Sequence, residues 1–279
     1  MKIGIIGNGY VGKATSLLKC EDIEVLIWDL DEKLRNINEF KELQDCKFVF
    51  VCVPTPMDKD GSCYTDIVST VAKDLIALGI TPEHIVIRST VPVGTSEELG
   101  VSMMPEFLTE ANWEKDFKQM KCRIVGVQNP NDNNLRREFE EMFTAALWNG
   151  KIDSDEFIFC KTNEAELSKL TRNTFLAVKV SFFNEVEEFC SKKSIDYETL
   201  IKLVSIDERI GASHTQVPGP DGKRGYGGTC FPKDISSLYN QMVNELGMES
   251  FVVESSIRRN LNVDRLEKEW ENEKGRSVI

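Results

Sequence analysis

The stretch that decides the fold is residues 2–12, KIGIIGNGYVG, close to the start of the chain. An apolar run typical of a buried strand leads directly into Gly7, Gly9 and Gly12, which have G-x-G-x-x-G spacing. In a strand–turn–helix unit the first glycine permits a tight turn and the second lets the backbone approach a pyrophosphate. The third lets the helix pack against the strand. The glycines alone are a weak signal, because a glycine-rich turn also occurs in unrelated α/β folds.

An acidic residue strengthens the interpretation of this turn as a dinucleotide site. Asp29 directly follows a second apolar run at residues 24–28, where a carboxylate can bind both ribose hydroxyls. The same carboxylate would repel the 2′-phosphate of NADP, so NAD is the expected cofactor. Tyr10 and Val11, inside the turn, are expected to contact it too. The alternative is that residues 29–31 form a solvated turn.

Further apolar runs define the fold class of the first part of the chain. They lie at residues 48–53, 84–88, 123–127 and 156–160 and alternate with helical segments. Continuous apolar strands alternating with helices predict an α/β fold with a Rossmann-type, doubly wound parallel sheet. Two strands break at proline-containing loops, and ligands bind at that carboxyl edge of such a sheet. We therefore expect four loop residues to contact the cofactor, although each could belong to an ordinary loop: Val53, Pro54, Thr55 and Thr90.

The character of the sequence changes near residue 160. Asn163 and Glu166 have the spacing of a capping box, and no glycine or proline interrupts residues 163–193. The middle of this segment is apolar on nearly all sides, which predicts a long helix buried by its own domain or by a second subunit. Further helices are expected at residues 197–204, 234–246 and 250–273. We therefore predict an NAD-binding domain at 1–160, an all-helical domain at 161–279, and a homodimer formed through the long helix.

Composition limits the partners and the compartment. A formal charge of −12 argues against nucleic acid and against an anionic membrane surface. No stretch approaches the ~20 apolar residues of a membrane helix, and no secretory signal is evident, so we expect a cytoplasmic protein. The eight cysteines are scattered and only two histidines are present. We therefore expect reduced thiols and no metal site.

The most informative segment of the second part is residues 225–234, GYGGTCFPKD. Its glycines allow close backbone approach and unusual conformations around a single thiol, that of Cys230. Pro232 suits the start of a helix, so Cys230 is expected just ahead of a helix N-terminus, a position that favours the thiolate. Most cysteines in such a chain are core residues, but this one has the surroundings of a nucleophile.

These segments together resemble the UDP-glucose/GDP-mannose dehydrogenase family. The matching motifs occur in the family's order and cover nearly the whole chain; the most specific are the cysteine loop and the Lys-x-x-x-Asn pair. They lie at residues 7–12, 53–56, 89–95 (STVPVGT), 105–108 (PEFL), 164–169 (EAELSK), 173, 184–185, 209–211 and 225–234. The resemblance implies oxidation of the 6-hydroxyl of a nucleotide sugar to a carboxylate. Two NAD-dependent hydride transfers would pass through a cysteine thiohemiacetal and a thioester.

The resemblance also implies roles for individual residues. Cys230 would attack the aldehyde. Lys169 and Asn173, four apart on one helix, project from one face and could donate to one developing oxyanion. Asp234 would hold Lys169 or a water that accepts the alcohol proton, Glu106 would be the general base for thioester hydrolysis, and Thr90 would position water. The substrate would be bound by these residues and their neighbours: Glu106, Phe107, Leu108, Lys169, Asn173, Arg209, Gly225, Tyr226, Gly227 and Lys233.

The sequence also departs from the family. Members normally continue into a further domain that binds the nucleotide of the substrate, so this chain is expected to be a short form. Met104 stands where Asn usually precedes the PEFL motif, and Ala111 where Gly is common. A non-catalytic NAD-binding regulatory or partner protein is therefore the main alternative. A 3-hydroxyacid or 6-phosphogluconate type of dehydrogenase is disfavoured, because those enzymes need no nucleophilic cysteine.

Overall fold

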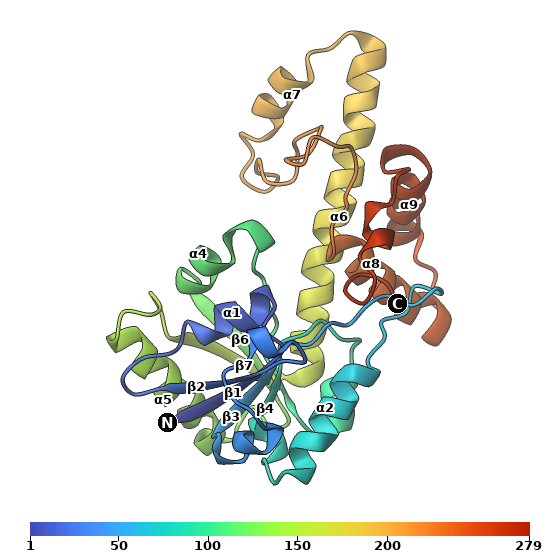
Figure 1. Ribbon diagram of the computed structural model, residues 1–279. Coiled ribbons are helices and arrows are strands. Elements are labelled where there is room, and N and C mark those ends of the chain that lie inside the picture. Colours follow the sequence, from blue (N-terminus) through green and yellow to red (C-terminus); the bar gives the residue numbers. More distant parts are fainter. The chain divides into compact units, whose positions relative to one another are not determined.

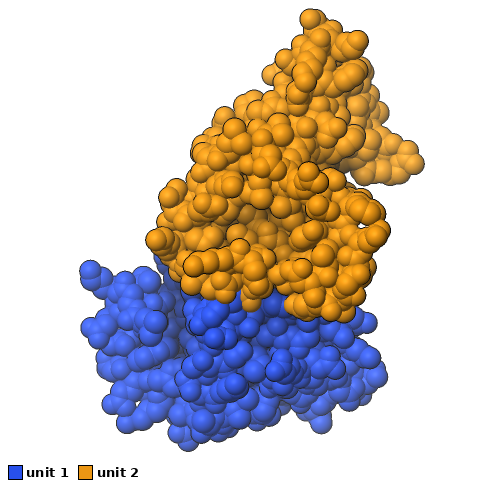
Figure 2. Space-filling view, turned by 90° about the vertical axis from the view of Figure 1, so that its right-hand side faces the viewer, with its two compact units in different colours: residues 1–55, 64–169 blue, residues 56–63, 170–279 orange.

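A computed structural model describes residues 1–279 and divides into two compact units (Figure 2). Unit 1 comprises residues 1–55 and 64–169, and unit 2 comprises residues 56–63 and 170–279. The short segment 56–63 thus leaves the sheet-containing unit after one of its strands and belongs with the helical unit. The boundary expected near residue 160 lies at the end of the last strand, before the division between the units.

Unit 1 is built around a seven-stranded sheet with the order β2-β1-β3-β4-β5-β6-β7 (Figure 1). All neighbouring strands run parallel except β5 and β6, which are antiparallel. The strands are β1 (Lys2–Ile6), β2 (Glu24–Trp28), β3 (Phe48–Val51), β4 (Ile85–Ile87), β5 (Ser102–Met103), β6 (Cys122–Val127) and β7 (Glu156–Lys161). The Rossmann-like α/β fold with a mostly parallel sheet is therefore confirmed, and the sheet contains one antiparallel pairing, between β5 and β6.

Helices connect the strands of unit 1. They are α1 (Tyr10–Ser16), α2 (Asp66–Ala77), α3 (Thr95–Leu99), α4 (Trp113–Lys118) and α5 (Asn133–Trp148). Short 3₁₀ turns lie at Glu32–Leu34, Phe40–Asp45, Pro82–His84 and Glu110–Asn112. β1 lies between β2 and β3. The chain therefore adds β2 on one side of β1 and then crosses to the other side to add β3, so the strand order reverses at β1. In α/β sheets a ligand binds at the carboxyl ends of the strands at such a reversal.

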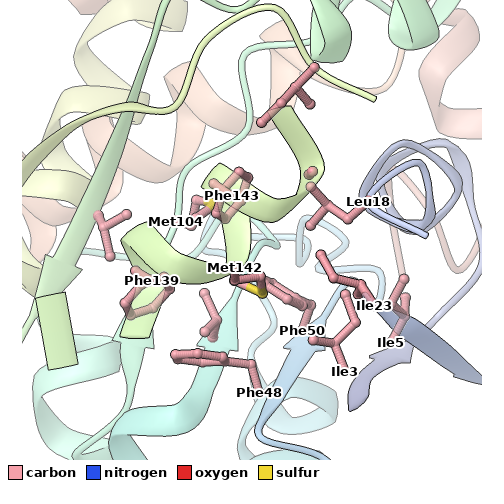
Figure 3. Packing of buried hydrophobic residues seen from close by; sticks show 14 of the residues in the cluster. Ile3, Ile5, Leu18, Ile23, Phe48, Phe50, Met104, Phe139, Met142 and Phe143 are labelled. Atoms are coloured by element: carbon pink, nitrogen blue, oxygen red, sulfur yellow. The ribbon is translucent and has the colours of Figure 1, made fainter. Parts of the chain in front are cut away.

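The sheet is buried on both faces, which explains the continuous apolar runs of its strands. Every residue of β3 and β4 is buried, and Phe48 and Phe50 are fully covered. One core cluster brings Ile3 and Ile5 of β1 together with Phe139, Met142 and Phe143 of α5 (Figure 3). A second cluster contains Val49 and Val51, which alternate along β3 with Phe48 and Phe50 of the first cluster, and packs them against Val68 and Leu75 of α2. Alternate residues of a strand point to opposite faces, so α2 and α5 cover different sides of the sheet.

The helix α6 (Thr162–Lys193) is the long helix expected from the sequence (Figure 1). Its start is different from the prediction. Glu166 does not close a capping box with Asn163; its carboxylate instead accepts hydrogen bonds from the N–H groups of Gly94 and Ser96. At the first turn the carboxylate of Glu164 accepts from the N–H of Lys161. Glu166 therefore binds N–H donors that are distant in sequence instead of the local capping-box partner.

The remaining helices of unit 2 are α7 (Tyr197–Val204), α8 (Phe231–Asn240) and α9 (Phe251–Arg259). Each of the last two continues into a π-type turn, at Gln241–Glu245 and Asn260–Asp264. Ala177 of α6, Ile235 of α8 and Val253 of α9 form the core of the unit with Tyr226. No helix of the chain is sufficiently long and apolar to cross a membrane.

The prediction of one helix over residues 250–273 is wrong. The helical path ends at Asp264, and only a 3₁₀ turn at Glu269–Asn272 follows. Beyond it, the backbone N–H of Met57 donates to the carbonyl of Ser277 at 2.8 Å, and the N–H of Ile279 donates to the carbonyl of Met57 at 3.1 Å. These bonds join the last residues of the chain to segment 56–63 inside unit 2.

Candidate active site

The glycine turn has the geometry that its spacing predicts. Gly7 has φ of +88°, and its N–H donates to the carbonyl of Trp28 at 2.9 Å. A Cβ at Gly7 would lie 2.7 Å from the carbonyl oxygen of Cys52, and a Cβ at Gly12 would collide with the carbonyl of Gly7. A Cβ at Gly9 would meet nothing within 4 Å. Two glycines are therefore required by close packing, while Gly9 borders open space at the start of α1, where Tyr10 and Val11 follow.

Asp29 lies directly beside this turn. Its Oδ2 accepts the N–H of Asn8 at 2.6 Å, and its Oδ1 accepts the N–H of Asp31 at 2.9 Å. The side-chain Oδ1 of Asn8 is buried and has no hydrogen-bond partner in the structure. A carboxylate, an open glycine and a free acceptor at one helix start fit a dinucleotide, with its phosphates at the helix and its ribose at the acid. Gly7, Gly9, Gly12 and Asp29 would hold the cofactor.

The two proline-containing loops are fastened to each other at the carboxyl edge of the sheet. The hydroxyl of Thr55 donates to the carbonyl of Thr90 at 2.7 Å, and the hydroxyl of Ser89 donates to the carbonyl of Val53 at 2.6 Å. The loops after β3 and β4 therefore form one rigid rim. This rim carries the residues predicted from sequence, Val53, Pro54, Thr55 and Thr90, at the edge where a ligand of this fold binds.

Glu106 and Lys169 form a buried ion pair inside unit 1. The distance from Nζ of Lys169 to Oε2 of Glu106 is 3.3 Å, and both side chains are about 5% exposed. Lys169 also donates to the backbone carbonyl of Glu106, and the other oxygen of Glu106 accepts the N–H of Leu108. The ammonium lies 5.6 Å from the ring centre of Phe107. Each partner thus fixes the other, because an unpaired charge would be costly at this depth.

A second cluster of polar residues surrounds the start of α8 in unit 2. Cys230 is the N-cap residue of that helix, as the sequence predicts. Asp234, fully buried, accepts the side-chain amide of Asn173 at 2.6 Å and the ammonium of Lys233 at 2.7 Å. Burial opposes the charge of Lys233, but Asp234, and to a smaller extent Cys63 and Cys230, raise its pKa. Lys233 is therefore a cation held in place by Asp234 in the first turn of the helix that Cys230 caps.

Asp234 and Lys169 bind different partners in the structure. The sequence suggests that Asp234 holds Lys169 or a water. In the structure Asp234 binds Asn173 and Lys233, whereas Lys169 binds Glu106. Asn173 follows Lys169 by one turn of α6. Its amide is oriented by Asp234, whereas the ammonium of Lys169 is oriented by Glu106.

Four of the other cysteines lack the properties of a nucleophile. Burial raises the pKa of Cys46 to about 12 and the pKa of Cys52 and Cys160 to about 11. These thiols stay protonated at neutral pH, and the thiolate is the reactive form. Cys190 is 1% exposed in the interior of unit 2. Cys230 differs from all four because it caps a helix and lies close to a lysine.

The remaining predicted substrate residues have varied surroundings. Arg209 is highly exposed and pairs with Asp207, with 2.5 Å between Nη2 and Oδ2. The side chain of Tyr226 is buried in the core of unit 2, and its backbone N–H and carbonyl both bond to the side chain of Asn260. Gly225 has φ of +66° and lies, like Gly227, against the side chains of residues 260–269.

The sequence did not indicate that Glu166 connects α6 to the loop before α3. Its fully buried carboxylate accepts the N–H of Gly94 at 2.6 Å and that of Ser96 at 2.8 Å. It therefore ties the first turn of α6 to the loop that carries Thr90. Its distance along the chain from both donors explains why no local pattern indicated the contact.

Comparison with known proteins identifies the class that this fold and site define. Residues 31–146 match the family model described as the UDP-glucose/GDP-mannose dehydrogenase family, NAD binding domain, and residues 163–262 match the central domain of the same family. The UDP-glucose 6-dehydrogenase of Rickettsia bellii is 30% identical over 303 residues, covering 93% of this chain and 67% of that protein. The chain belongs to the UDP-glucose/GDP-mannose dehydrogenase family, which is a family of oxidoreductases, and its cofactor is NAD.

Solved structures share the fold. A UDP-glucose dehydrogenase from Pyrobaculum islandicum has a TM-score of 0.76 at 23% identity, covering 93% of this chain and 67% of that chain. A 3-hydroxyisobutyrate dehydrogenase from Mycobacterium tuberculosis has a TM-score of 0.69 at 17% identity, covering 92% and 91%. Fold alone therefore does not separate the two chemistries, and the family is assigned by sequence. The chain spans about two thirds of the length of its dehydrogenase relatives.

Proposed function

We propose that this protein oxidises the 6-hydroxyl of a nucleotide sugar to a carboxylate, a reaction of the UDP-glucose to UDP-glucuronate type. The observation that carries the proposal is the position of Cys230 at the N-cap of α8, with Asp234 of the same helix bound to both Asn173 and Lys233. The same cluster follows a cysteine loop typical of the family to which the chain belongs. A protein that only binds NAD has no use for this set of groups.

The proposed chemistry is covalent catalysis by the thiol of Cys230. NAD, when bound, accepts one hydride in each of two successive oxidations. Between them, the sulfur adds to the aldehyde carbon, a C–S bond forms, and the carbonyl oxygen gains a proton, giving a thiohemiacetal. The second oxidation gives a thioester. Water then breaks the C–S bond, releasing the carboxylate and restoring the thiol.

Lys169 and Asn173 are proposed to donate hydrogen bonds to the oxygen that gains charge. Lys169 has three N–H donors, and the ion pair with Glu106 uses only part of them. Asn173 has two amide N–H donors, of which one is taken by Asp234. Each residue keeps a donor for the substrate, and each is already oriented by a buried carboxylate. Preorganised donors of this kind stabilise an oxyanion.

Glu106 is proposed to be the base that activates water for thioester hydrolysis, with Thr90 positioning that water. Its carboxylate is buried and fixed by Lys169 and by the N–H of Leu108, so it has a single orientation. Phe107 and Leu108, with the backbone of Gly225, Tyr226 and Gly227, are proposed to line the substrate. Arg209 is proposed to reach the substrate from its exposed loop. Lys233 is proposed to support Asp234 and the thiolate.

A homodimer formed through α6 is part of the proposal. Phe175, Phe182 and Phe189 follow one another at intervals of seven residues and are 57–63% exposed. Residues at this spacing lie on one stripe of a helix, and an exposed stripe of phenylalanine is typical of a contact between subunits. The cytoplasm is the proposed compartment, because a reduced thiol and NAD are available there.

The second candidate is an NAD-binding regulatory or partner protein without catalysis. It needs only the NAD-binding domain, which the family model matches over residues 31–146. The intact cluster around Cys230 argues for the enzyme. A single experiment distinguishes the two.

The protein is incubated with NAD and a panel of UDP- and GDP-sugars, and reduced cofactor is followed by absorbance. The proposal predicts two equivalents of reduced cofactor for each sugar consumed, with a uronate as product. One equivalent would indicate an ordinary alcohol dehydrogenase. A protein that binds NAD but reduces none of it with any sugar would favour the second candidate.

A further inference from the structure

The backbone just ahead of Cys230 is held by side chains rather than by other backbone. The N–H of Gly225 donates to Oδ1 of Asn184 at 3.1 Å, and the N–H and carbonyl of Tyr226 both bond to the side chain of Asn260 at 2.9 Å. The N–H of Gly228 donates to the carboxylate of Glu269 at 3.2 Å. The loop that presents the thiol thus depends on three side chains from separate parts of unit 2.

Two of the loop glycines are required by these side chains. A Cβ at Gly225 would collide with Oδ1 of Asn260, and a Cβ at Gly227 would lie 2.5 Å from Nη2 of Arg265 and would collide with Glu269. Gly225 and Gly228 also have positive φ, +66° and +71°. The glycine-rich composition of the loop is therefore explained in part by contact with residues 260–269.

Arg265 is the centre of the contact at the C-terminal side. Its side chain is 3% exposed, and it donates to Glu269 from Nε at 2.9 Å and to the carbonyl of Arg224 from Nη1 at 3.1 Å. Its Nη2 binds Asp221 at 2.5 Å. The hydrogen bond from Arg265 lowers the pKa of Glu269 to about 2. Glu269 is therefore ionised at neutral pH, and its charge strengthens the bond from Gly228.

These two residues lie outside the part of the chain that the family models match. The match to the central domain ends at residue 262, whereas Arg265 and Glu269 follow it. The segment that contains them also includes buried Trp270 and reaches the pairing with Met57. The contact with the cysteine loop is thus made by a segment whose role the family assignment does not describe.

We propose that Arg265 and Glu269 are positioning residues that hold the Gly225–Cys230 loop and thereby set the reactivity of Cys230. This inference rests on the proposed role of Cys230 as the nucleophile. Neither residue acts on substrate. Glu269 fixes the N–H two positions before the thiol, and Arg265 fixes Glu269 and the start of the loop.

The test compares Glu269→Ala and Glu269→Gln with Glu271→Gln, an exposed residue two positions further on. Alkylation of Cys230 by iodoacetamide is measured by peptide mass spectrometry over a range of pH, with the buried Cys190 as internal reference. Loss of a hydrogen bond to a charged group is expected to raise the alkylation rate of Cys230 about tenfold in Glu269→Ala. Cys190 should be unaffected. Glu269→Gln keeps one oxygen acceptor but loses the charge and one of the bonds from Arg265, so its alkylation rate should lie between those of wild type and Glu269→Ala, whereas Glu271→Gln should match wild type.

The result that would overturn the inference is a Cys230 alkylation rate in Glu269→Ala equal to that of wild type. Equal acceleration of Cys230 and Cys190 would also overturn it, because that would be general loosening of unit 2. If Glu269→Ala does not fold, Arg265→Lys takes its place with the same expected increase, because lysine lacks the planar fork that binds Glu269 and Arg224 together. None of these readouts needs a substrate, so the inference can fail or succeed independently of the dehydrogenase reaction.

Discussion

At the scale of single residues, the account depends on how buried charges are matched. Lys169 pairs with Glu106, and Lys233 with Asp234, and all four side chains are buried. A buried pair contributes little net stability, but removal of one partner leaves an uncompensated charge that costs several kcal/mol. Such pairs are retained where a fixed charge is useful. In this protein the Lys233–Asp234 pair lies in the first turn of α8, which begins after the proposed nucleophile Cys230.

The first prediction concerns Cys230→Ala. Without a sulfur to hold the aldehyde, carboxylate formation should fall by more than about a thousandfold, since the covalent route is lost. The affinity for NAD should stay unchanged, because the glycine turn and Asp29 are untouched. Product analysis by chromatography and NAD titration by fluorescence measure the two effects. Cys122→Ala, a half-buried cysteine on β6, is the matched control, and acid production by Cys230→Ala at the wild-type rate would refute the covalent route.

At the scale of elements, Glu166 connects α6 to the loop before α3. Glu166→Ala would leave the N–H groups of Gly94 and Ser96 without their acceptor, and we expect a loss of about 3 kcal/mol in the free energy of unfolding. Glu166→Gln keeps one acceptor and should lose roughly half as much. Exposed Glu98→Ala should stay within about 0.5 kcal/mol of wild type. Guanidinium unfolding gives all three values; a Glu166→Ala variant as stable as Glu98→Ala would contradict this role.

The same residue predicts a pH dependence. Burial raises the pKa of Glu166, against the opposing effect of the N–H donors of Ser96 and Gly94. A carboxyl with a raised pKa in the folded state takes up its proton there first, so wild type gains stability relative to Glu166→Gln as pH falls through that pKa toward 4.5. Unfolding at pH 7 and pH 5 should therefore show the wild-type advantage increasing at the lower pH. An advantage that shrinks would mean that the carboxylate is better solvated than its burial implies.

The elements differ in how far the sequence could predict them. The strands β1, β2 and β3 follow from apolar runs that end at glycine, aspartate or proline. The strand β5 contains only Ser102 and Met103, which is too short to give a pattern, so β5 and its antiparallel pairing with β6 were not predicted. Glu166 has capping-box spacing with Asn163, but donors from another loop bind it. Local patterns predict elements well where local contacts decide them, and fail where a distant group competes.

The residues of the candidate site also differ in how far the sequence could indicate them. Cys230 could be found because glycine, proline and lysine surround it in sequence, and the capping position that they imply is present. Arg265 and Glu269 could not be found, because their partners are backbone groups some forty residues earlier. The only trace in the sequence is the run of glycines at 225–228, which signals a close approach without naming what approaches.

At the scale of the whole molecule, the exposed stripe on α6 predicts assembly. Phe182→Asp should convert the homodimer into a monomer, because a carboxylate in an apolar contact loses its hydration without a partner. Trp148→Asp, which changes an even more exposed aromatic residue on α5, should leave the dimer intact. Light scattering at micromolar concentration measures both. A wild-type protein that is monomeric under these conditions would contradict the prediction before any variant is made.

The central claim is that the sugar carbon becomes bound to the sulfur of Cys230, and peptide mass spectrometry after a rapid acid quench tests it most directly. The protein and its Glu106→Gln variant are mixed with NAD and the sugar that reduces it, then digested. The account predicts an acyl adduct on the peptide that contains Cys230, more abundant in the variant because hydrolysis of the thioester is slowed. Carboxylate that accumulates through many turnovers while the Cys230 peptide stays unmodified in both proteins would contradict the account.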